Sequence, residues 1–427
     1  MRTKKRGRVG LALGAAALVA LTACGPAHAA AQGTQTIELW ESHAGGPVAN
    51  AEAALVQKFN QTHRDVQVKL TVTKASTKAL AALQTGNPPL LAEISHYDGP
   101  FLRAHALQSL NSFIEGSQGL SATARKDIYP GVWSNGEVNG QHYRLLADVK
   151  VSEFFYNERL FQKAGIQHTP TTWSELATDL VKLKRLGVIP LAFKDASAHI
   201  EPAFISNGGA LFKSGSNNQS TEYNSKAGVE TFSYFHDLYS RGLMTFAHGA
   251  SIRAELAAGK LAIGDATSAG YAKALAAVNG KFTLGAFAYP KGISGHSGNI
   301  SQGLGFVIFT HHSQVQQQAA WSFIKWFDEP QQMAYWAMQT GFDPVTKGAL
   351  RYIPSAYLKT HPGLAVSLQE VASPYTVPRA APDAYAEVEQ SLDAAFFKAV
   401  KGQESIAQAL SQLDQQAHQY LLGHASL

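Results

Sequence analysis

The chain has 427 residues, of which 45% are apolar, 10% aromatic and 16% charged, and this composition excludes a disordered, collagen-like or coiled-coil protein. Five of the 36 lysines and arginines lie within the first eight residues, which leaves 31 basic against 31 acidic side chains from Cys24 onward. A neutral balance over the rest of the chain gives no electrostatic argument for binding nucleic acid.

Residues 1–23 have the pattern of a lipoprotein signal peptide. The basic run is followed by an apolar stretch at 9–23, shorter than the roughly 18 to 20 residues that a membrane-spanning helix needs. The stretch ends in LTACG at 21–25, which resembles a bacterial lipobox and implies that Cys24 is lipidated after cleavage. An ordinary secreted protein with a cysteine near its cleavage site is the alternative. We expect an extracytoplasmic protein that a lipid on Cys24 anchors to the cell membrane.

The rest of the chain is long enough for two lobes. Cys24 is the only cysteine, so a monomer can form neither a disulfide nor a cysteine-based metal site. Residues 24–35 are small and polar, as in a flexible tether. The roughly 400 residues that follow are too many for one hydrophobic core.

The first elements after the tether alternate between strand and helix. Val48, Ala51, Leu55 and Phe59 share one helical face, and the segment VQVKLTV at 66–72 alternates with the period of a half-exposed strand. Strands are predicted at 37–40, 66–72 and 90–94, and helices at 48–60 and 76–83.

A second group of elements begins after Asn139-Gly140, a dipeptide typical of a tight hairpin. Strands are predicted near 143–146, 151–156, 189–193, 261–266, 282–288 and 305–310, and helices at 173–186, 226–239, 314–327, 333–339, 386–401 and 405–421. This order predicts an α/β fold, with helices on the faces of its sheets. No segment of 20 to 50 residues repeats, which argues against a solenoid or a propeller.

Motifs for catalysis are missing from the sequence. The AAGK segment at 257–260 is followed by Leu261 instead of the serine or threonine of a phosphate-binding loop. The 16 histidines include no HExxH pattern, and GISGHSG at 292–298 lacks the spacing of a nucleophile elbow. We expect no catalytic residue, no metal and no cofactor.

Carboxylates and aromatic side chains near predicted strand ends suit a binding site for a polar solute. Such carboxylates could serve a glycoside hydrolase or accept hydrogen bonds from sugar hydroxyls, and sequence alone does not pair them. Aromatic faces stack on pyranose rings. The carboxylates are Glu41, Glu93, Asp98, Asp148 and Glu153. Trp321, Trp326, Tyr335 and Trp336 lie within predicted helices, where we expect them to pack in the core.

Several segments, in order and spacing, resemble extracellular solute-binding proteins of family 1, the receptor subunits of bacterial ABC sugar importers. They are IELWESHAGG at 37–46, TGNPP at 85–89, VSEFFYNERLFQKAGI at 151–166, SQGLGFVIF at 301–309, WSFIKWFDEPQQMAYWAMQTGFDPVTKGAL at 321–350 and PRAAPDAYAEVEQSL at 378–392. The resemblance runs from about residue 37 to residue 422, essentially the whole mature chain.

The resemblance implies a two-lobe periplasmic-binding-protein-like fold with its ligand cleft at the hinge. Lobe 1 would comprise 36–148 and 304–345, and lobe 2 would comprise 149–303 and 346–427. The chain would cross between the lobes near 146–151, near 302–306 and again after Phe342. Such a monomer would make and break no bond, and would deliver its solute to membrane permease subunits.

The resemblance leaves two ligand classes open, a carbohydrate and a glycerol phosphate. WESHAGG, QTGFDPVTK and Arg379 resemble the branch that binds sn-glycerol 3-phosphate or glycerophosphodiesters. PRAAPDAY also occurs in plain sugar binders, and His96 stands where the phosphate branch has a carboxylate. We expect a sugar or oligosaccharide first and a glycerol phosphate second, with an exported glycoside hydrolase and a non-transport surface receptor as more distant alternatives.

The expected ligand contacts come from both lobes. Tyr156 and Trp173 form a weaker pair in lobe 2, and Trp173 is expected to pack on the core as its helix begins. The expected binding residues are Trp40, Glu41, His43, His96, Tyr97, Asp98, Asp148, Tyr156, Gly303, Gly341, Phe342 and Arg379.

Overall fold

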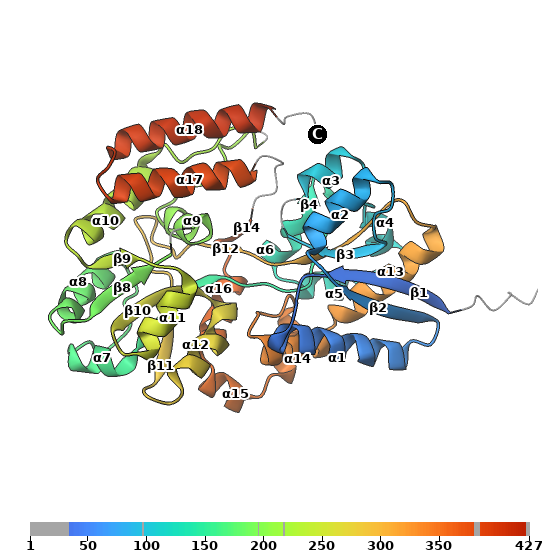
Figure 1. Cartoon of the computed structure of the whole chain (residues 1–427), viewed down its shortest axis with the longest axis horizontal. Coiled ribbons are helices and arrows are strands. Elements are labelled where there is room, and N and C mark those ends of the chain that lie inside the picture. Colours follow the sequence, from blue (N-terminus) through green and yellow to red (C-terminus); the bar gives the residue numbers. More distant parts are fainter. Residues whose placement is uncertain (1–33, 96–97, 195, 217, 380–384, 424–427) are drawn as a thin grey trace, which may run out of the picture.

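The structure is a computed structural model that describes residues 34–95, 98–194, 196–216, 218–379 and 385–423. Figure 1 shows two α/β halves side by side, each with helices packed around its own sheet. We call them lobe 1, which contains the first strands of the chain, and lobe 2, which contains the two C-terminal helices. The expected two-lobe α/β fold is confirmed.

The sheet of lobe 1 has five strands from distant parts of the chain. In spatial order they are β2 (Val66–Val72), β1 (Gln35–Glu41), β3 (Leu91–Ile94), β13 (Gly305–Ile308) and β6 (Leu145–Leu146). Strands β1, β2 and β3 are parallel, whereas β13 runs antiparallel to both of its neighbours. The last of these five strands in the chain, β13, therefore lies inside the sheet rather than at its edge.

Several helices of lobe 1 pack against that sheet. The helices of the lobe's N-terminal part are α1 (Gly46–Thr62), α2 (Ala75–Gln84), α3 (Gly99–Arg103), α4 (Asn111–Glu115), α5 (Ala122–Asp127) and α6 (Pro130–Trp133), followed by the 3₁₀ turn η1 (Ser134–Gly136). α13 (Gln314–Phe327) and α14 (Pro330–Thr340) follow β13. Ser313 and Gln316 form a capping box at the start of α13, which satisfies two backbone donors there. Trp321, Trp326 and Trp336 are buried in the lobe 1 core, as expected.

Lobe 2 is built around a second five-stranded sheet. Its spatial order is β11 (Leu284–Ala288), β7 (Ser152–Asn157), β10 (Leu261–Thr267), β8 (Ile189–Phe193) and β9 (Met244–Phe246). Its helices are α7 (Glu158–Lys163), α8 (Trp173–Lys184), α9 (Ser197–Ser206), α10 (Lys226–Ser240), α11 (Gly249–Ala257), α12 (Tyr271–Val278), α17 (Tyr385–Val400) and α18 (Ile406–Gly423), with the 3₁₀ turn η2 (Ser268–Gly270) before α12.

Three segments run between the lobes and hydrogen-bond to one another. The backbone N–H of Lys150 donates to the carbonyl of Gln302 at 2.8 Å, and that of Asp343 donates to the carbonyl of Val149 at 2.8 Å. A side chain at Gly303 would place its Cβ 2.1 Å from the Asp148 carbonyl, so the close approach of two crossings requires glycine there. The three segments form one hinge.

The segment after the third crossing packs between the lobes. It contains the turn η3 (Lys347–Tyr352), α15 (Ser355–Thr360), α16 (Pro362–Ala372) and β14 (Thr376–Pro378), which pairs with β12 (Asn299–Ser301). α16 contacts β11 and β7 of lobe 2, while Leu364 and Leu368 join the apolar core of lobe 1.

The hairpin at Asn139-Gly140 is formed, but by strands outside the predicted ones. Both residues have positive φ, 52° and 76°, as a tight hairpin turn needs. The paired strands are β4 (Glu137–Val138) and β5 (Gln141–His142), shorter than sequence periodicity can detect. Among the described helices, none combines the length and the apolar character that crossing a membrane requires.

Candidate functional site

A cavity of about 250 Å³ lies between the lobes, beside the hinge. Lobe 1 contributes Val48, Thr340 and Phe342 to its wall, and the first crossing contributes Lys150. The wall on the side of lobe 2 comes from β7, the residue after β8, α11, β10, η2 and α12. Its residues are Phe155, Lys194, Gly249, Ile252, Arg253, Asp265, Ala266, Thr267, Ala269, Gly270 and Lys273. A solute held here contacts both lobes.

Four of the residues that line the cavity are cationic, and they lie close to one another. Burial lowers the pKa of Lys150, while the negative charge of Asp148 raises it. The nearby positive charges of Arg379, Lys194 and Lys273 lower it further. Within the described part of the chain, no carboxylate is ion-paired with Lys150, Lys194, Arg253 or Lys273. The cavity therefore presents positive charge that its own side chains do not neutralise.

A buried network of hydrogen bonds fixes Lys194 at the carboxyl end of β8. Asp265 accepts hydrogen bonds from the His199 ring at 2.9 Å, from the Tyr289 hydroxyl at 2.7 Å and from the Lys194 backbone N–H at 3.0 Å. The Lys194 ammonium lies 3.2 Å from Nε2 of His199. Burial lowers the pKa of His199, despite the charge of Asp265, so a neutral ring can donate from Nδ1 and accept from Lys194.

Glu41 and His43, both expected in the site, lie in a buried cluster at the carboxyl end of β1. Nδ1 of His43 is 3.5 Å from Glu41 Oε2, 3.1 Å from Glu52 Oε2 and 3.4 Å from Glu93 Oε2. Burial lowers the pKa of His43, but the hydrogen bond to Glu52 and the charges of Glu93 and Glu52 outweigh it and raise that pKa to about 10. Burial and the charge of Glu52 raise the pKa of Glu93 well above its usual range.

The expected residues Asp148, Gly303, Gly341 and Phe342 lie at the hinge. Asp148 is buried, and its Oδ1 accepts a hydrogen bond from the Leu304 backbone N–H at 3.0 Å. Gly341 ends α14 with a φ of 79°, a conformation that favours glycine. The ring of Phe342 lies beneath the Lys150 ammonium, 5.7 Å away. These four residues are brought together, and of them Phe342 lines the cavity.

Three further expected contacts lie elsewhere in the fold. Trp40 is 9% exposed and packs in a small apolar cluster beneath the ammonium of Lys78. Asp98 forms a buried ion pair with Arg144, and Tyr156 packs on Phe161 with ring centroids 4.4 Å apart. Residues Trp40, Asp98 and Tyr156 do not line the cavity among the described residues.

Trp173 packs on the core of lobe 2 at the first position of α8, as expected. Its indole N–H donates to the Ser206 hydroxyl at 2.8 Å, and Thr172 caps the helix. His96, Tyr97 and Cys24 lie outside the described residues.

Arg379, expected near a phosphate, contacts a carboxylate within the protein. Its Nε donates to Glu389 of α17 at 2.7 Å, and its Nη1 lies 3.5 Å from the Gln302 side-chain oxygen. Burial and the charge of Glu389 raise the pKa of the neighbouring Glu201 to about 8, against the charge of Arg379. Arg379 therefore joins the second crossing to the C-terminal helices as well as adding positive charge near Lys150.

The cationic residues Lys150, Lys194, Arg253 and Lys273 were not predicted from the sequence. Lys194 directly follows β8, and the carboxyl ends of strands in α/β sheets are where ligands bind, so its position held a usable signal. Arg253 and Lys273 lie on two helices, 59 and 79 residues beyond Lys194 in the chain. Nothing in the local sequence marks them as neighbours of Lys194.

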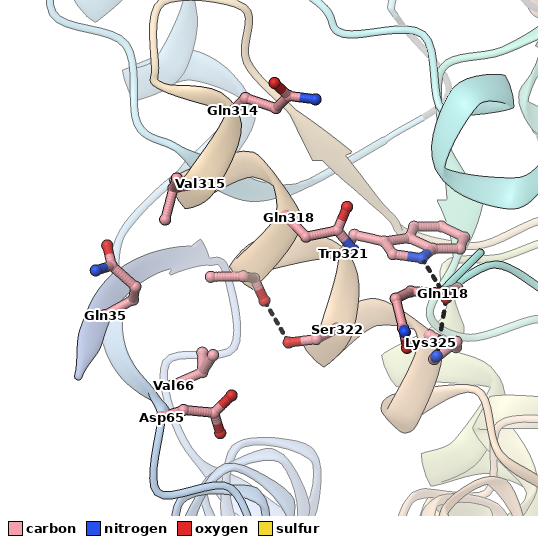
Figure 2. Close-up of a pocket in the computed structure, with 11 residues that line it drawn as sticks. Gln35, Asp65, Val66, Gln118, Gln314, Val315, Gln318, Trp321, Ser322 and Lys325 are labelled. Atoms are coloured by element: carbon pink, nitrogen blue, oxygen red, sulfur yellow. Dashed lines mark hydrogen bonds between the residues drawn. The ribbon is translucent and has the colours of Figure 1, made fainter. Parts of the chain in front are cut away.

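A larger cavity of about 560 Å³ lies on lobe 1 alone, along α13 (Figure 2). In it, the Trp321 indole N–H and the Lys325 ammonium both donate to the Gln118 carbonyl, at 3.2 and 2.9 Å. The other labelled side chains come from the start of β1, from Asp65 and Val66 where β2 begins, and from α13. Because all its lining residues belong to lobe 1, movement between the lobes cannot enclose a ligand there.

Comparison with known proteins places this geometry in a family. The family model described as bacterial extracellular solute-binding protein matches residues 54–366. The sn-glycerol-3-phosphate-binding periplasmic protein UgpB of Pectobacterium atrosepticum is 21% identical over 368 residues, which cover 82% of each chain.

Two solved structures share the fold over almost the whole chain. The cyclic alpha-maltosyl-1,6-maltose binding protein from Arthrobacter globiformis has a TM-score of 0.79 at 22% identity, over 92% of this chain and 100% of that one. UgpB from Mycobacterium tuberculosis in complex with glycerophosphocholine has a TM-score of 0.78 at 22% identity, over the same shares. At these identities, the structural likeness shows a common fold.

Proposed function

The chain belongs to the bacterial extracellular solute-binding proteins, and from this membership we propose that it captures a solute between its lobes and delivers it to the permease of an ABC importer. The family resemblance inferred from the sequence is confirmed. Its members are binding proteins, and their place is outside the cytoplasm. The two lobes with a cavity at their hinge supply the geometry that capture needs.

The cationic wall of the cavity supports a ligand that bears a phosphate group. Lys150, Lys194, Arg253 and Lys273 face one small space, and an anion there would relieve their mutual repulsion. Ammonium and guanidinium groups donate charge-assisted hydrogen bonds to phosphate oxygens. A glycerol phosphate or a glycerophosphodiester combines that charge with a size suited to about 250 Å³. The UgpB relatives, one named for sn-glycerol 3-phosphate and one solved in complex with glycerophosphocholine, support the same ligand class.

A carbohydrate is the second candidate. Asp265 can accept hydrogen bonds from hydroxyl groups, and the half-buried ring of Phe342 offers an apolar face to a sugar. The Arthrobacter neighbour binds a cyclic maltosyl-maltose. The two candidates differ in charge, which makes them separable by experiment.

Closure of the lobes follows from contacts that only the closed state provides. Val48 and Phe342 lie on one side of the cavity, and Lys194 and Arg253 lie on the other. A ligand that touches both sides favours the closed arrangement by its differential affinity. The hinge of three hydrogen-bonded crossings allows this movement without unfolding either sheet.

We also propose that a lipid on Cys24 holds the protein at the membrane, close to the permease. Residues 9–25 support this through their apolar stretch and the LTACG sequence. Residues 24–35 would then tether the lobes to the lipid.

The test is a thermal-shift comparison of matched ligands with the purified protein. Glycerol 3-phosphate and glycerophosphocholine are compared with glycerol, and maltose represents neutral oligosaccharides. A ligand at 100 times its dissociation constant stabilises the fold by about 2.7 kcal/mol. We expect stabilisation by the phosphate-bearing ligands that weakens as salt is raised. Stabilisation by maltose alone, unaffected by salt, would contradict a phosphate-bearing ligand and support a carbohydrate.

A further inference from the structure

Four metal-ligating side chains from three elements of lobe 1 converge on one buried point. Glu41 ends β1, His43 follows it in the loop, Glu52 lies in the second turn of α1, and Glu93 lies in β3. Each of the three glutamates is 1% exposed. We propose that Glu41, His43, Glu52 and Glu93 bind a divalent transition-metal ion of the Zn²⁺ type.

The distances match the coordination sphere of such an ion. Zn²⁺ holds histidine nitrogen and carboxylate oxygen at about 2.0 to 2.2 Å, and the edges of that tetrahedron are about 3.3 to 3.6 Å long. The oxygens Oε2 of Glu41, Glu52 and Glu93 lie 3.5, 3.1 and 3.4 Å from Nδ1 of His43. Ligand atoms of Glu41, His43 and Glu52 all lie within 4.8 Å of one another, so small side-chain shifts suffice to place an ion among these three, with Glu93 approaching it from the side of His43.

Unsatisfied polar atoms in the cluster point to a missing cation. Neither carboxylate oxygen of Glu93 accepts a hydrogen bond, and Oε1 of Glu52 accepts none. Both side chains are buried, so each such oxygen loses its hydration without a replacement. Metal coordination satisfies these oxygens more completely than one imidazole ring can.

The charge count supports the same conclusion. Three carboxyl groups face one imidazole, so a protonated His43 can balance the negative charge of only one of them. Glu93, whose pKa is raised well above its usual range, would lose its proton when it binds the ion. Nearby Asp148 adds a further negative charge to the surroundings of His43. A divalent ion supplies the positive charge that the cluster lacks, and the His43 side chain, 14% exposed, gives the ion a path from solvent.

The ion would join β1, α1 and β3 behind the lobe 1 side of the solute cavity. Val48, which lines that cavity, lies in α1 one turn before Glu52. The ion would thus hold the cavity wall in place. This inference does not depend on the proposed solute, because the metal is measured without any solute present.

The experiment is equilibrium dialysis of the purified full chain against Zn²⁺, followed by counting of bound metal. A Cys24→Ser background removes the only thiol, which could itself bind Zn²⁺. We expect one ion per chain, and at least tenfold weaker binding in Glu93→Gln and in Glu52→Gln. Glu153→Gln is the matched control, because Glu153 is an equally buried carboxylate in lobe 2 whose oxygens also accept no hydrogen bond.

Two further measurements keep the proposal open to refutation. If Glu93→Gln does not fold, His43→Gln removes the nitrogen ligand at a less buried position and should also weaken binding at least tenfold. Co²⁺ in place of Zn²⁺ should give the visible absorption of a tetrahedral site, and that absorption should be lost in His43→Gln. The absence of bound metal, or equal binding by the wild type and the ligand variants, would overturn the proposal.

Discussion

Replacement of Lys194 by methionine tests whether the cavity recognises an anion. Methionine keeps an unbranched apolar side chain and removes the ammonium group. Lys194 is held in place by the backbone hydrogen bond to Asp265 at 3.0 Å and by the contact with His199 at 3.2 Å. Its charge therefore lies at a fixed position in the cavity wall, where a bound phosphate would meet it.

The expected size of the effect follows from one charge-assisted hydrogen bond. Such a bond contributes about 1.5 to 3 kcal/mol, which corresponds to roughly a 10- to 150-fold change in dissociation constant. Lys150 and Lys273 stay in place, so binding should weaken without being abolished. Because the charge of Lys194 lowers the pKa of Lys150 by repulsion, its removal should leave the stability of the ligand-free protein unchanged or slightly higher.

Isothermal titration calorimetry with glycerol 3-phosphate at two salt concentrations measures this effect. Lys281→Met is the control, since Lys281 is an exposed lysine of lobe 2 outside the cavity. The control should bind as the wild type does. A dissociation constant within twofold of the wild-type value in a folded Lys194→Met protein would refute the assignment of the anion site.

Three other outcomes are expected. Cys24→Ser should release the protein from the membrane fraction and leave solute binding intact. Fractionation and a binding assay measure the two effects. Continued retention in membranes, with no partner present, would contradict lipidation. Arg379→Ala should lower the free energy of unfolding by about 3 kcal/mol, because it removes the ion pair between Arg379 and the buried carboxylate of Glu389. Denaturant unfolding measures this, and the double variant with Glu389→Gln should recover much of the loss. Burial raises the pKa of Asp343 to about 7, so the folded state binds a proton more tightly than the unfolded state. The stability that this group contributes is therefore present at low pH and is lost as the pH rises from about 4 to 7. Asp343→Asn should remove this part of the pH dependence of the free energy of unfolding, and an unchanged pH profile in unfolding curves would contradict the assignment.

The larger elements of the fold were predictable from the sequence because their signals are local. β2 (Val66–Val72) and α13 (Gln314–Phe327) have the predicted bounds. The first has the alternation of a strand, and the structure shows that a capping box opens the second. α3 to α6 have four to six residues each, which is too few for a period to show. The short strand pair of β12 and β14 joins segments about 75 residues apart and leaves no local pattern.

The candidate site was predictable only where it follows a strand. Glu41 ends β1 and His43 lies two residues beyond it, so their place near the carboxyl ends of the lobe 1 strands could be inferred. Trp40 precedes Glu41, and the alternation of strand residues directs its ring to the opposite face of the sheet, into the cluster around Phe101. The cationic wall forms where the end of β8, α11 and α12 of lobe 2 meet the first crossing. These segments are far apart in the sequence, so no local pattern predicts that they meet. The chain from Cys24 onward has equal numbers of basic and acidic side chains, so its net charge does not reveal the local excess of positive charge at the cavity.

The position of β13 in the sheet of lobe 1 restricts the order in which the protein can fold. β13 (Gly305–Ile308) lies between β3 and β6, and both of those strands are complete by residue 146. A growing chain must therefore add about 160 more residues before the gap in its first sheet can close. Contacts of such long sequence separation slow folding. Lobe 1 thus cannot mature as an independent unit during synthesis, and a chain that stops before residue 305 retains two unpaired strand edges facing each other.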